Sequence, residues 1–325
     1  MNKIFISCQY LANIILLSAL AIDIDASSLA QADSSNYETF ADWCEHQADL
    51  SADARYTVEV LLEYTETEAC DRADTILNSW PSLILVDEQI TDLGPISSLE
   101  KLTHLALLEN QISDVAPLSE MTNLERLYLR DNQISDLEPL SNLINLQELG
   151  LEFNQVTNVE PLSTLTQLRF LDLSHNQITH LEPLSTLTSL DWLYLQENQI
   201  ISVAPLSTLT DLYWLNLNHN QIASIESLSN LTQLGILELY SNQIVSVAPL
   251  STLTNLEYID LSDNQIVSVD ALSTLINLDG LYLESNQIED IQSLSTLNNL
   301  NSLGLDNNPF SDRTCPLQPT SICRF

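Results

Sequence analysis

Two carboxylates, Glu238 and Asp260, are the residues best placed for acid–base chemistry, because they occupy the same position in successive 22-residue repeats. If each repeat forms one turn of a coil, the two carboxyls stand on adjacent turns, at roughly the 5 Å separation that retaining glycosidases use. Like charges so close would raise the pKa of one acid. Such pairs arise readily among 45 acidic residues, and a smooth repeat surface offers no closed pocket. A glycoside hydrolase is therefore a remote alternative, and a non-catalytic protein is expected.

The histidines and cysteines do not favour a metal or cofactor site. His175 and His219 share a repeat position but lie two repeats apart, too far to bind one ion. Cys44 and His46 lack the ligand spacing of a structural zinc site. The sequence contains no phosphate loop or nucleophile motif, so we expect no metal and no cofactor.

A repeated phrase, LxxLxxLxLxxNQIxxLxPLSxL, positions all of these residues. Its apolar columns include Leu171 and Leu173 at alternate positions, which predicts a short strand, and similar strands are expected over 105–107, 171–173 and 237–239. No single helix or strand can bury all seven apolar columns, whereas a coil of one turn per repeat can. The Pro column, which includes Pro183, begins a return segment that is too short for a full helix, so 3₁₀ turns or extended chain are expected there.

Ten asparagines interrupt the apolar run at one fixed position. An Asn side chain carries donors and an acceptor, so a stack of them can satisfy backbone groups where each turn leaves its strand. We therefore predict a structural ladder of Asn110, Asn132, Asn154, Asn176, Asn198, Asn220, Asn242, Asn264, Asn286 and Asn308.

Period and phrase together resemble the 22-residue leucine-rich repeats of bacterial internalins and of the repeat subunit that regulates protein phosphatase 1. The match covers about residues 80–308, and the Cys-containing flanks are similar to those of exported bacterial, particularly cyanobacterial, leucine-rich repeat proteins. The resemblance implies an α/β solenoid: a right-handed, curved horseshoe with parallel strands on a concave face that binds proteins. The sequence lacks an Ig-like domain, a sorting signal and a surface-anchoring repeat, so the invasion role of internalins does not carry over.

Aromatic and acidic residues gather at the outward positions of the middle strands. Over all eleven repeats from 82 to 306, eight of the 33 outward positions are aromatic, against 6% of the chain. Aromatic residues also stack on strand surfaces for stability alone, but exposed Trp and Tyr are enriched at interfaces. The predicted site for a protein partner with a basic patch consists of Phe170, Asp172, Trp192, Tyr194, Trp214, Glu238, Tyr240, Tyr258, Asp260, Tyr282 and Glu284. Glycan binding, with sugars stacked on Trp192 and Trp214, is the alternative.

Two further pairs at outward positions have opposite charges on neighbouring repeats. Arg126 is followed one repeat later by Glu148, and Arg130 by Glu152. We expect internal salt bridges within both pairs, not contacts to a ligand.

Composition and the chain ends indicate an exported protein. A net charge of -36 argues against nucleic acid and anionic membranes as partners. Residues 1–32 resemble a signal peptide, although an uncleaved anchor stays open, and no later stretch could span a membrane. Residues 33–79 are expected to form a helical cap with Ser51 and Thr67 as helix caps, 80–308 the repeats and 309–325 a C-terminal cap. Disulfides are expected within each cap, joining Cys44 to Cys70 and Cys315 to Cys323.

Overall fold

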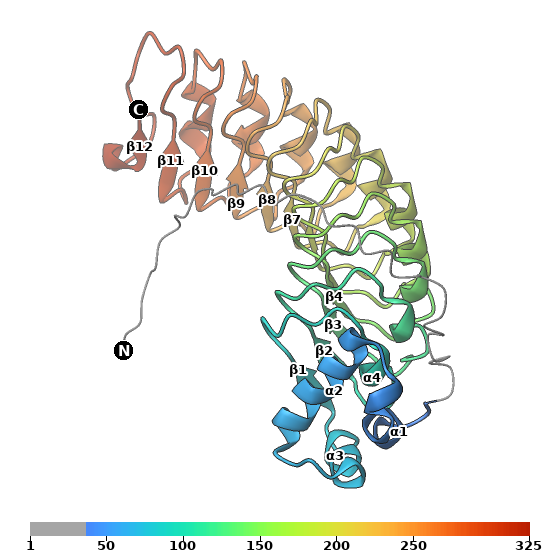
Figure 1. The fold of residues 1–325 in the computed structure, drawn as a ribbon. Helices are drawn as coiled ribbons and strands as arrows, with labels where there is room; N and C mark the ends of the chain where they lie inside the picture. The colour runs from blue at the N-terminus through green and yellow to red at the C-terminus, as the bar shows by residue number, and fades with distance from the viewer. Residues whose placement is uncertain (1–36) are drawn as a thin grey trace, which may run out of the picture.

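The computed structural model describes residues 37–325, so the predicted signal segment lies outside the described residues. These residues form a curved solenoid in which each turn contributes one three-residue strand to a concave sheet and one short helix to the convex side (Figure 1). All twelve strands are parallel and follow chain order from β1 to β12. The fold is the leucine-rich repeat solenoid that the repeated phrase predicts. We call each turn a rung and number it by its strand.

The strands begin one residue earlier than expected, because the outward residue before the first core leucine already pairs. They are β1 Ser82–Ile84, β2 His104–Ala106, β3 Arg126–Tyr128, β4 Glu148–Gly150, β5 Phe170–Asp172, β6 Trp192–Tyr194, β7 Trp214–Asn216, β8 Ile236–Glu238, β9 Tyr258–Asp260, β10 Gly280–Tyr282, β11 Ser302–Gly304 and β12 Cys323–Arg324. Residues one repeat apart face each other in register, as Leu171 and Leu193 do.

Short helices line the convex side. The first is α4 Gly94–Ser97, and the rest are 3₁₀ helices: η3 Ala116–Leu118, η4 Glu138–Leu140, η5 Glu160–Thr164, η6 Glu182–Thr186, η7 Ala204–Thr208, η8 Glu226–Asn230, η9 Ala248–Thr252, η10 Asp270–Thr274 and η11 Gln292–Thr296. Most begin with a proline at their first or second position, where its missing N–H costs nothing. The apolar columns between the two sides are almost completely buried.

The asparagine ladder satisfies the backbone at each turn. Asn198 is typical: its Oδ1 accepts from the Ile178 N–H at 2.9 Å, and its Nδ2 donates to the Leu173 and Leu195 carbonyls at 2.9 and 3.2 Å. The residue before each ladder Asn is left-handed without being glycine, with φ between 53° for His175 and 60° for Asn307. Such a conformation costs about 1 kcal/mol or more per residue, and the adjacent buried hydrogen bonds offset it.

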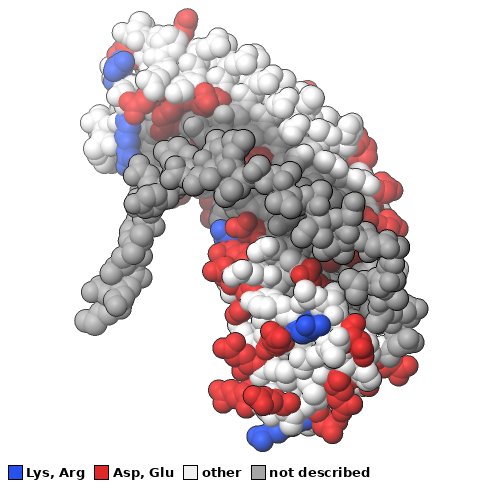
Figure 2. Space-filling view, viewed as in Figure 1, with Lys and Arg blue, Asp and Glu red and all other residues white. Residues whose placement is uncertain are grey.

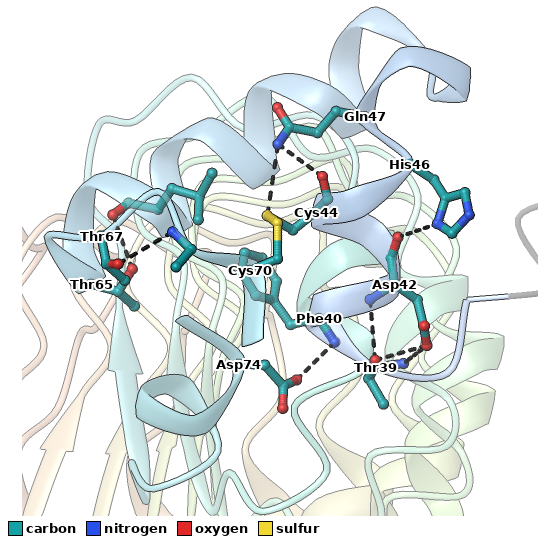
Figure 3. Close-up of a disulfide and its surroundings, with 12 residues drawn as sticks. Thr39, Phe40, Asp42, Cys44, His46, Gln47, Thr65, Thr67, Cys70 and Asp74 are labelled. Carbon is teal, nitrogen blue, oxygen red and sulfur yellow. Dashed lines mark hydrogen bonds between the residues drawn. A yellow bond between two sulfur atoms is a disulfide. The ribbon is translucent and has the colours of Figure 1, made fainter. Parts of the chain in front are cut away.

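Three helices precede the repeats and pack against the first rung. They are α1 Phe40–Glu45, α2 Ala52–Thr65 and α3 Cys70–Leu77, with a 3₁₀ turn, η2 Gln47–Asp49, between α1 and α2. A disulfide joins Cys44 of α1 to Cys70 of α3, beside Gln47 (Figure 3). The Trp43 ring lies against Gly94 of α4, so the cap covers the apolar end of the first turn.

Two details of this cap differ from expectation. Ser51 caps α2, accepting from the Ala54 N–H at 3.0 Å, but α3 begins after Ala69 without a side-chain cap, so the expected Thr67 cap is wrong. Thr67 instead accepts from the Ala69 N–H two residues later, a local turn that ends before the helix starts. The buried side of α3 consists of Ala73 and Leu77.

The C-terminal end is closed differently. A single turn, η12 Thr320–Ile322, leads into β12, which pairs with β11 and extends the sheet by one strand. The second expected disulfide, Cys315–Cys323, holds this segment. Within residues 37–325 no helix has the length and apolar character that a membrane crossing needs.

Candidate functional site

Four aromatic rings form one cluster on β5, β6 and β7, in the middle of the concave sheet. Phe170 lies 6.2 Å from Trp192 and 5.6 Å from Tyr194, measured between ring centroids. Trp214 lies 6.3 Å from Trp192 and 5.5 Å from Tyr194. The in-register pairing of these strands places the side chains on one face, because residues one repeat apart are directly opposite. We call these four residues the aromatic cluster.

The two tryptophans of the cluster are not equivalent. Trp192 is 44% exposed and is the most accessible ring of the cluster. Trp214 is half-buried, and its indole N–H donates to Glu238 Oε1 at 2.9 Å. The Trp192 ring is therefore accessible to a ligand, whereas the Trp214 ring packs against Trp192 from the neighbouring rung.

Glu238 is fixed by three donors, all on rung 7. Besides the Trp214 indole, the side-chain amides of Asn216 and Asn218 donate to Oε2 at 3.0 and 2.8 Å. Charge-assisted bonds of this kind are among the stronger ones in proteins. The carboxylate thus leans away from its own rung and toward the aromatic cluster.

Glu238 and Asp260 therefore do not form a catalytic pair of carboxyls pointing at one place. They are opposite each other in register, but Asp260 Oδ1 accepts from the Ser262 N–H on its own turn at 2.9 Å. The two carboxylates thus have different hydrogen-bond partners.

A second pair of acids, Glu152 and Asp172, borders the aromatic cluster on the other side. A Cβ on Gly150 would meet Glu152 Oε2 at 3.0 Å, so this carboxylate lies over the missing side chain of β4. That oxygen is buried without a hydrogen-bond partner. Burial raises the pKa of both carboxyls, and the Asp172 charge raises that of Glu152 further.

This geometry shows that one expected salt bridge is wrong. Arg126 and Glu148 form theirs at 3.0 Å, but Arg130 makes no ion pair with Glu152 in the described part of the chain. Its guanidinium lies over the Phe153 ring, 5.4 Å from the centroid. The Glu152 carboxylate instead fills the space that Gly150 leaves without a side chain. The left-handed residue Phe153 places its ring beside the Arg130 guanidinium.

The remaining predicted residues divide between two places. Tyr258 and Tyr282 pair at 5.4 Å, and Glu284 accepts from the Ser262 hydroxyl at 2.8 Å while lying over Gly304. Tyr240 stands apart, against the His219 ring at 4.8 Å. The structure thus brings most predicted residues onto one face but places Tyr240 at its margin.

Two tyrosines on this face, Tyr194 and Tyr258, have a raised pKa. Burial raises the pKa of Tyr194 to about 12, and the charges of Asp172 and Glu238 on either side add to the effect. Burial likewise raises the pKa of Tyr258 to about 12, with Asp260 as the next cause. Both hydroxyls remain hydrogen-bond donors at neutral pH.

Sequence reasoning missed three polar residues of this face. Asn216, Asn218 and Ser174 are uncharged and looked like spacer positions, but Asn216 and Asn218 fix Glu238, and Ser174 donates to Asp172 at 2.6 Å. Two of them carried a signal, since Ser174 stands two positions after Asp172 and Asn216 one repeat before Glu238, whereas Asn218 carried none. Among residues 37–325 no group of three His, Cys, Asp or Glu side chains is arranged to hold a metal ion.

Acidic residues dominate the charge on this face. From residue 170 to residue 306 its outward positions carry no Lys or Arg, but five acids: Asp172, Glu238, Asp260, Glu284 and Asp306. Figure 2 shows Asp and Glu at many places over the side of the molecule in view and Lys and Arg at few. The face therefore combines exposed aromatic area with negative charge.

Comparison with known proteins identifies the family. A model of leucine-rich repeats (two copies) matches residues 122–164, 144–186 and 232–275. An internalin (inlF) structure from Listeria monocytogenes strain 4b F2365 is 32% identical over 78% of this chain and 82% of its own, with a TM-score of 0.72. The chain belongs to the internalin-like leucine-rich repeat proteins. No curated protein sequence matches this internalin-like chain.

Two further structures resemble the internalin-like chain. Internalin C2 (inlC2) of the same Listeria strain is 29% identical, over 72% of this chain and 99% of its own, with a TM-score of 0.57. The plant peptide hormone receptor RGFR1, solved in complex with RGF2, is 26% identical over 66% of this chain and 38% of its own, with a TM-score of 0.60. The second of these is a receptor with its ligand bound, and together the neighbours support a protein-interaction module.

Proposed function

We propose that this protein is a non-catalytic binding module that holds a protein partner with a basic patch on the concave face between rungs 5 and 10. The observation that carries the proposal is the aromatic cluster: Trp192 is exposed, and the neighbouring Trp214 is hydrogen-bonded to a carboxylate, Glu238, that three donors fix. A preorganised acid next to an apolar anchor binds a cationic side chain without a further ordering cost.

The supporting chemistry is that of protein interfaces. Buried Trp and Tyr anchors supply most of the binding energy in many complexes. The acids around the cluster favour a basic partner and disfavour acidic ones, including nucleic acid.

Trp192→Ala tests this site once a partner has been captured from the producing cell's surface fraction. We expect the affinity to fall by about 2 kcal/mol, roughly 30-fold, and Trp214→Ala to cost a similar amount because it also releases Glu238. Tyr56, a 41% exposed ring on α2, provides the control, since Tyr56→Ala removes an aromatic outside the concave face. If Trp192→Ala and Trp214→Ala, combined in one folded protein, bind as tightly as the parent, the cluster is only strand packing.

Glycan binding is the alternative function and is tested by a separate experiment. A glycan array distinguishes the two functions, because only a carbohydrate-binding face would retain isolated sugars. Binding to such sugars, lost in Trp192→Ala, would replace the protein partner in this proposal.

Export is the second part of the proposal. Two disulfides form in an oxidising compartment, and residues 1–32 have the composition of a signal peptide. We expect the secreted or surface-bound protein to begin near residue 33, and to carry capping segments at 33–79 and 309–325 around the repeats. N-terminal sequencing of the protein from the producing cell checks this, and a mature protein that starts at Met1 would instead support an uncleaved anchor.

A further inference from the structure

The first strand leaves one edge of the sheet open. Within the described residues, 37–325, β1 is the terminal strand and pairs only with β2. Among residues 37–325 the cap helices pack on one another and on α4, and none of them pairs with β1. An unpaired strand edge can pair with a strand of another chain unless other elements cover it or charged side chains line it.

The backbone pattern shows which groups face this edge. Pro81 accepts from β2, and the N–H groups of Leu85 and Asp87 donate to Ala106 and Leu108. Because hydrogen-bonding directions alternate along a strand, the N–H and C=O of Ile84 and Val86 point the other way. No hydrogen bond from the described cap residues reaches them.

An apolar groove runs beside the open edge. It is lined by Tyr64, Trp80, Pro81, Ser82, Leu83 and Ile84. Ile84 is 57% exposed and Val86 42%, and neither carries a charge that would protect the edge from pairing. Tyr64 closes the rim, where its hydroxyl donates to Glu88 at 2.7 Å.

We propose that the outer edge of β1 binds an extended, non-acidic segment of a partner protein, which joins the sheet as an additional strand. Only an extended backbone matches alternate N–H and C=O groups, and the groove takes its apolar side chains. Glu63 and Glu88 beside Tyr64 repel an acidic segment. A second copy of the chain is disfavoured as the occupant, because each copy carries a net charge of -36.

This edge site is separate from the aromatic cluster and does not rest on the function proposed above. The test uses a fluorescein-labelled peptide of sequence Lys-Val-Thr-Val-Thr-Val-Lys and fluorescence anisotropy. The control peptide has the same side chains but is N-methylated at alternate residues, which removes its strand-pairing donors. We expect the first peptide to bind at least tenfold more tightly than the second, and Trp192→Ala to bind it like the parent.

Two variants locate the binding on β1. Ile84→Pro removes the outward N–H without breaking the ladder to β2, as prolines on edge strands do, and Ile84→Val keeps that N–H. We expect at least tenfold weaker binding for Ile84→Pro and no change for Ile84→Val. Hydrogen exchange on the parent gives a readout independent of any variant: the peptide should slow the Ile84 and Val86 amides at least fivefold. Absence of binding, equal binding by Ile84→Pro, or unchanged exchange at these amides would overturn the proposal.

Discussion

At the scale of single residues, the ladder asparagines make the turn possible. Each buries an amide that satisfies three backbone groups, one in its own turn and two in the preceding turn, as Asn198 shows. The residue beside it is left-handed, a conformation that costs free energy in residues other than glycine. The hydrogen-bonding needs of the backbone therefore explain why asparagine occupies these positions, without a role in ligand binding.

Asn198→Ala should lower the free energy of unfolding by about 2 kcal/mol, because it leaves the buried Ile178 N–H without a partner and removes one of two donors from the Leu173 and Leu195 carbonyls. Urea unfolding followed by circular dichroism measures the loss. Gln199→Ala, at the exposed neighbouring position, should change stability by less than about 0.5 kcal/mol. Equal effects from both substitutions would contradict the ladder's role.

The buried carboxyl of Glu152 should make the free energy of unfolding depend on pH. Burial raises its pKa above the ordinary value of about 4, so the folded protein binds this proton more tightly than the unfolded chain does. Stability is therefore gained as pH falls and lost as pH rises from about 4 through the raised value. Glu152→Gln should flatten this loss in urea unfolding between pH 4 and 7, whereas Glu160→Gln, on the exposed convex side, should retain the parent's slope. A parent-like slope in Glu152→Gln would contradict the buried, unpaired carboxyl.

At the scale of elements, the cap is held to the repeats by a close contact between α1 and α4. A Cβ on Gly94 would meet the buried Trp43 ring at 2.6 Å, and Gly94→Ala should therefore destabilise the protein by about 2 kcal/mol. Gly235→Ala is the matched control: its Cβ would meet Tyr213 at 2.3 Å, but that ring is exposed and can move aside. Thermal unfolding compares the two, and a smaller effect at Gly94 would place the cap contact elsewhere.

The elements themselves were largely predictable, with instructive exceptions. The 22-residue period predicted every strand of the repeats to within one residue, because one pattern had to hold in all turns. Helix α1 was not predicted, although Phe40, Trp43 and Cys44 are at helical spacing and Thr39 and Asp42 form a reciprocal cap, because six residues are too few for the pattern to stand out. Short elements that depend on tertiary contacts give little signal in a sequence.

At the scale of the whole molecule, curvature gathers one outward column from many turns onto a single face. The sequence placed Phe170, Trp192 and Trp214 on that face, because strand alternation determines which positions point outward. It did not predict that Glu238 leans back one rung or that Glu152 lies over Gly150. Those positions depend on the size of neighbouring side chains in adjacent turns, which a repeat pattern does not encode.

Hydroxyl-radical footprinting of the captured complex tests most directly whether the concave face binds the partner. Side-chain oxidation reports the exposure of Trp and Tyr rings themselves, and Trp192 is 44% exposed in the free protein. We expect the partner to slow oxidation of Trp192 at least fivefold and also to protect Tyr258, while Tyr56 on the cap is oxidised at its free rate. Protection of Tyr56 with unchanged oxidation of Trp192 would contradict binding on the concave face.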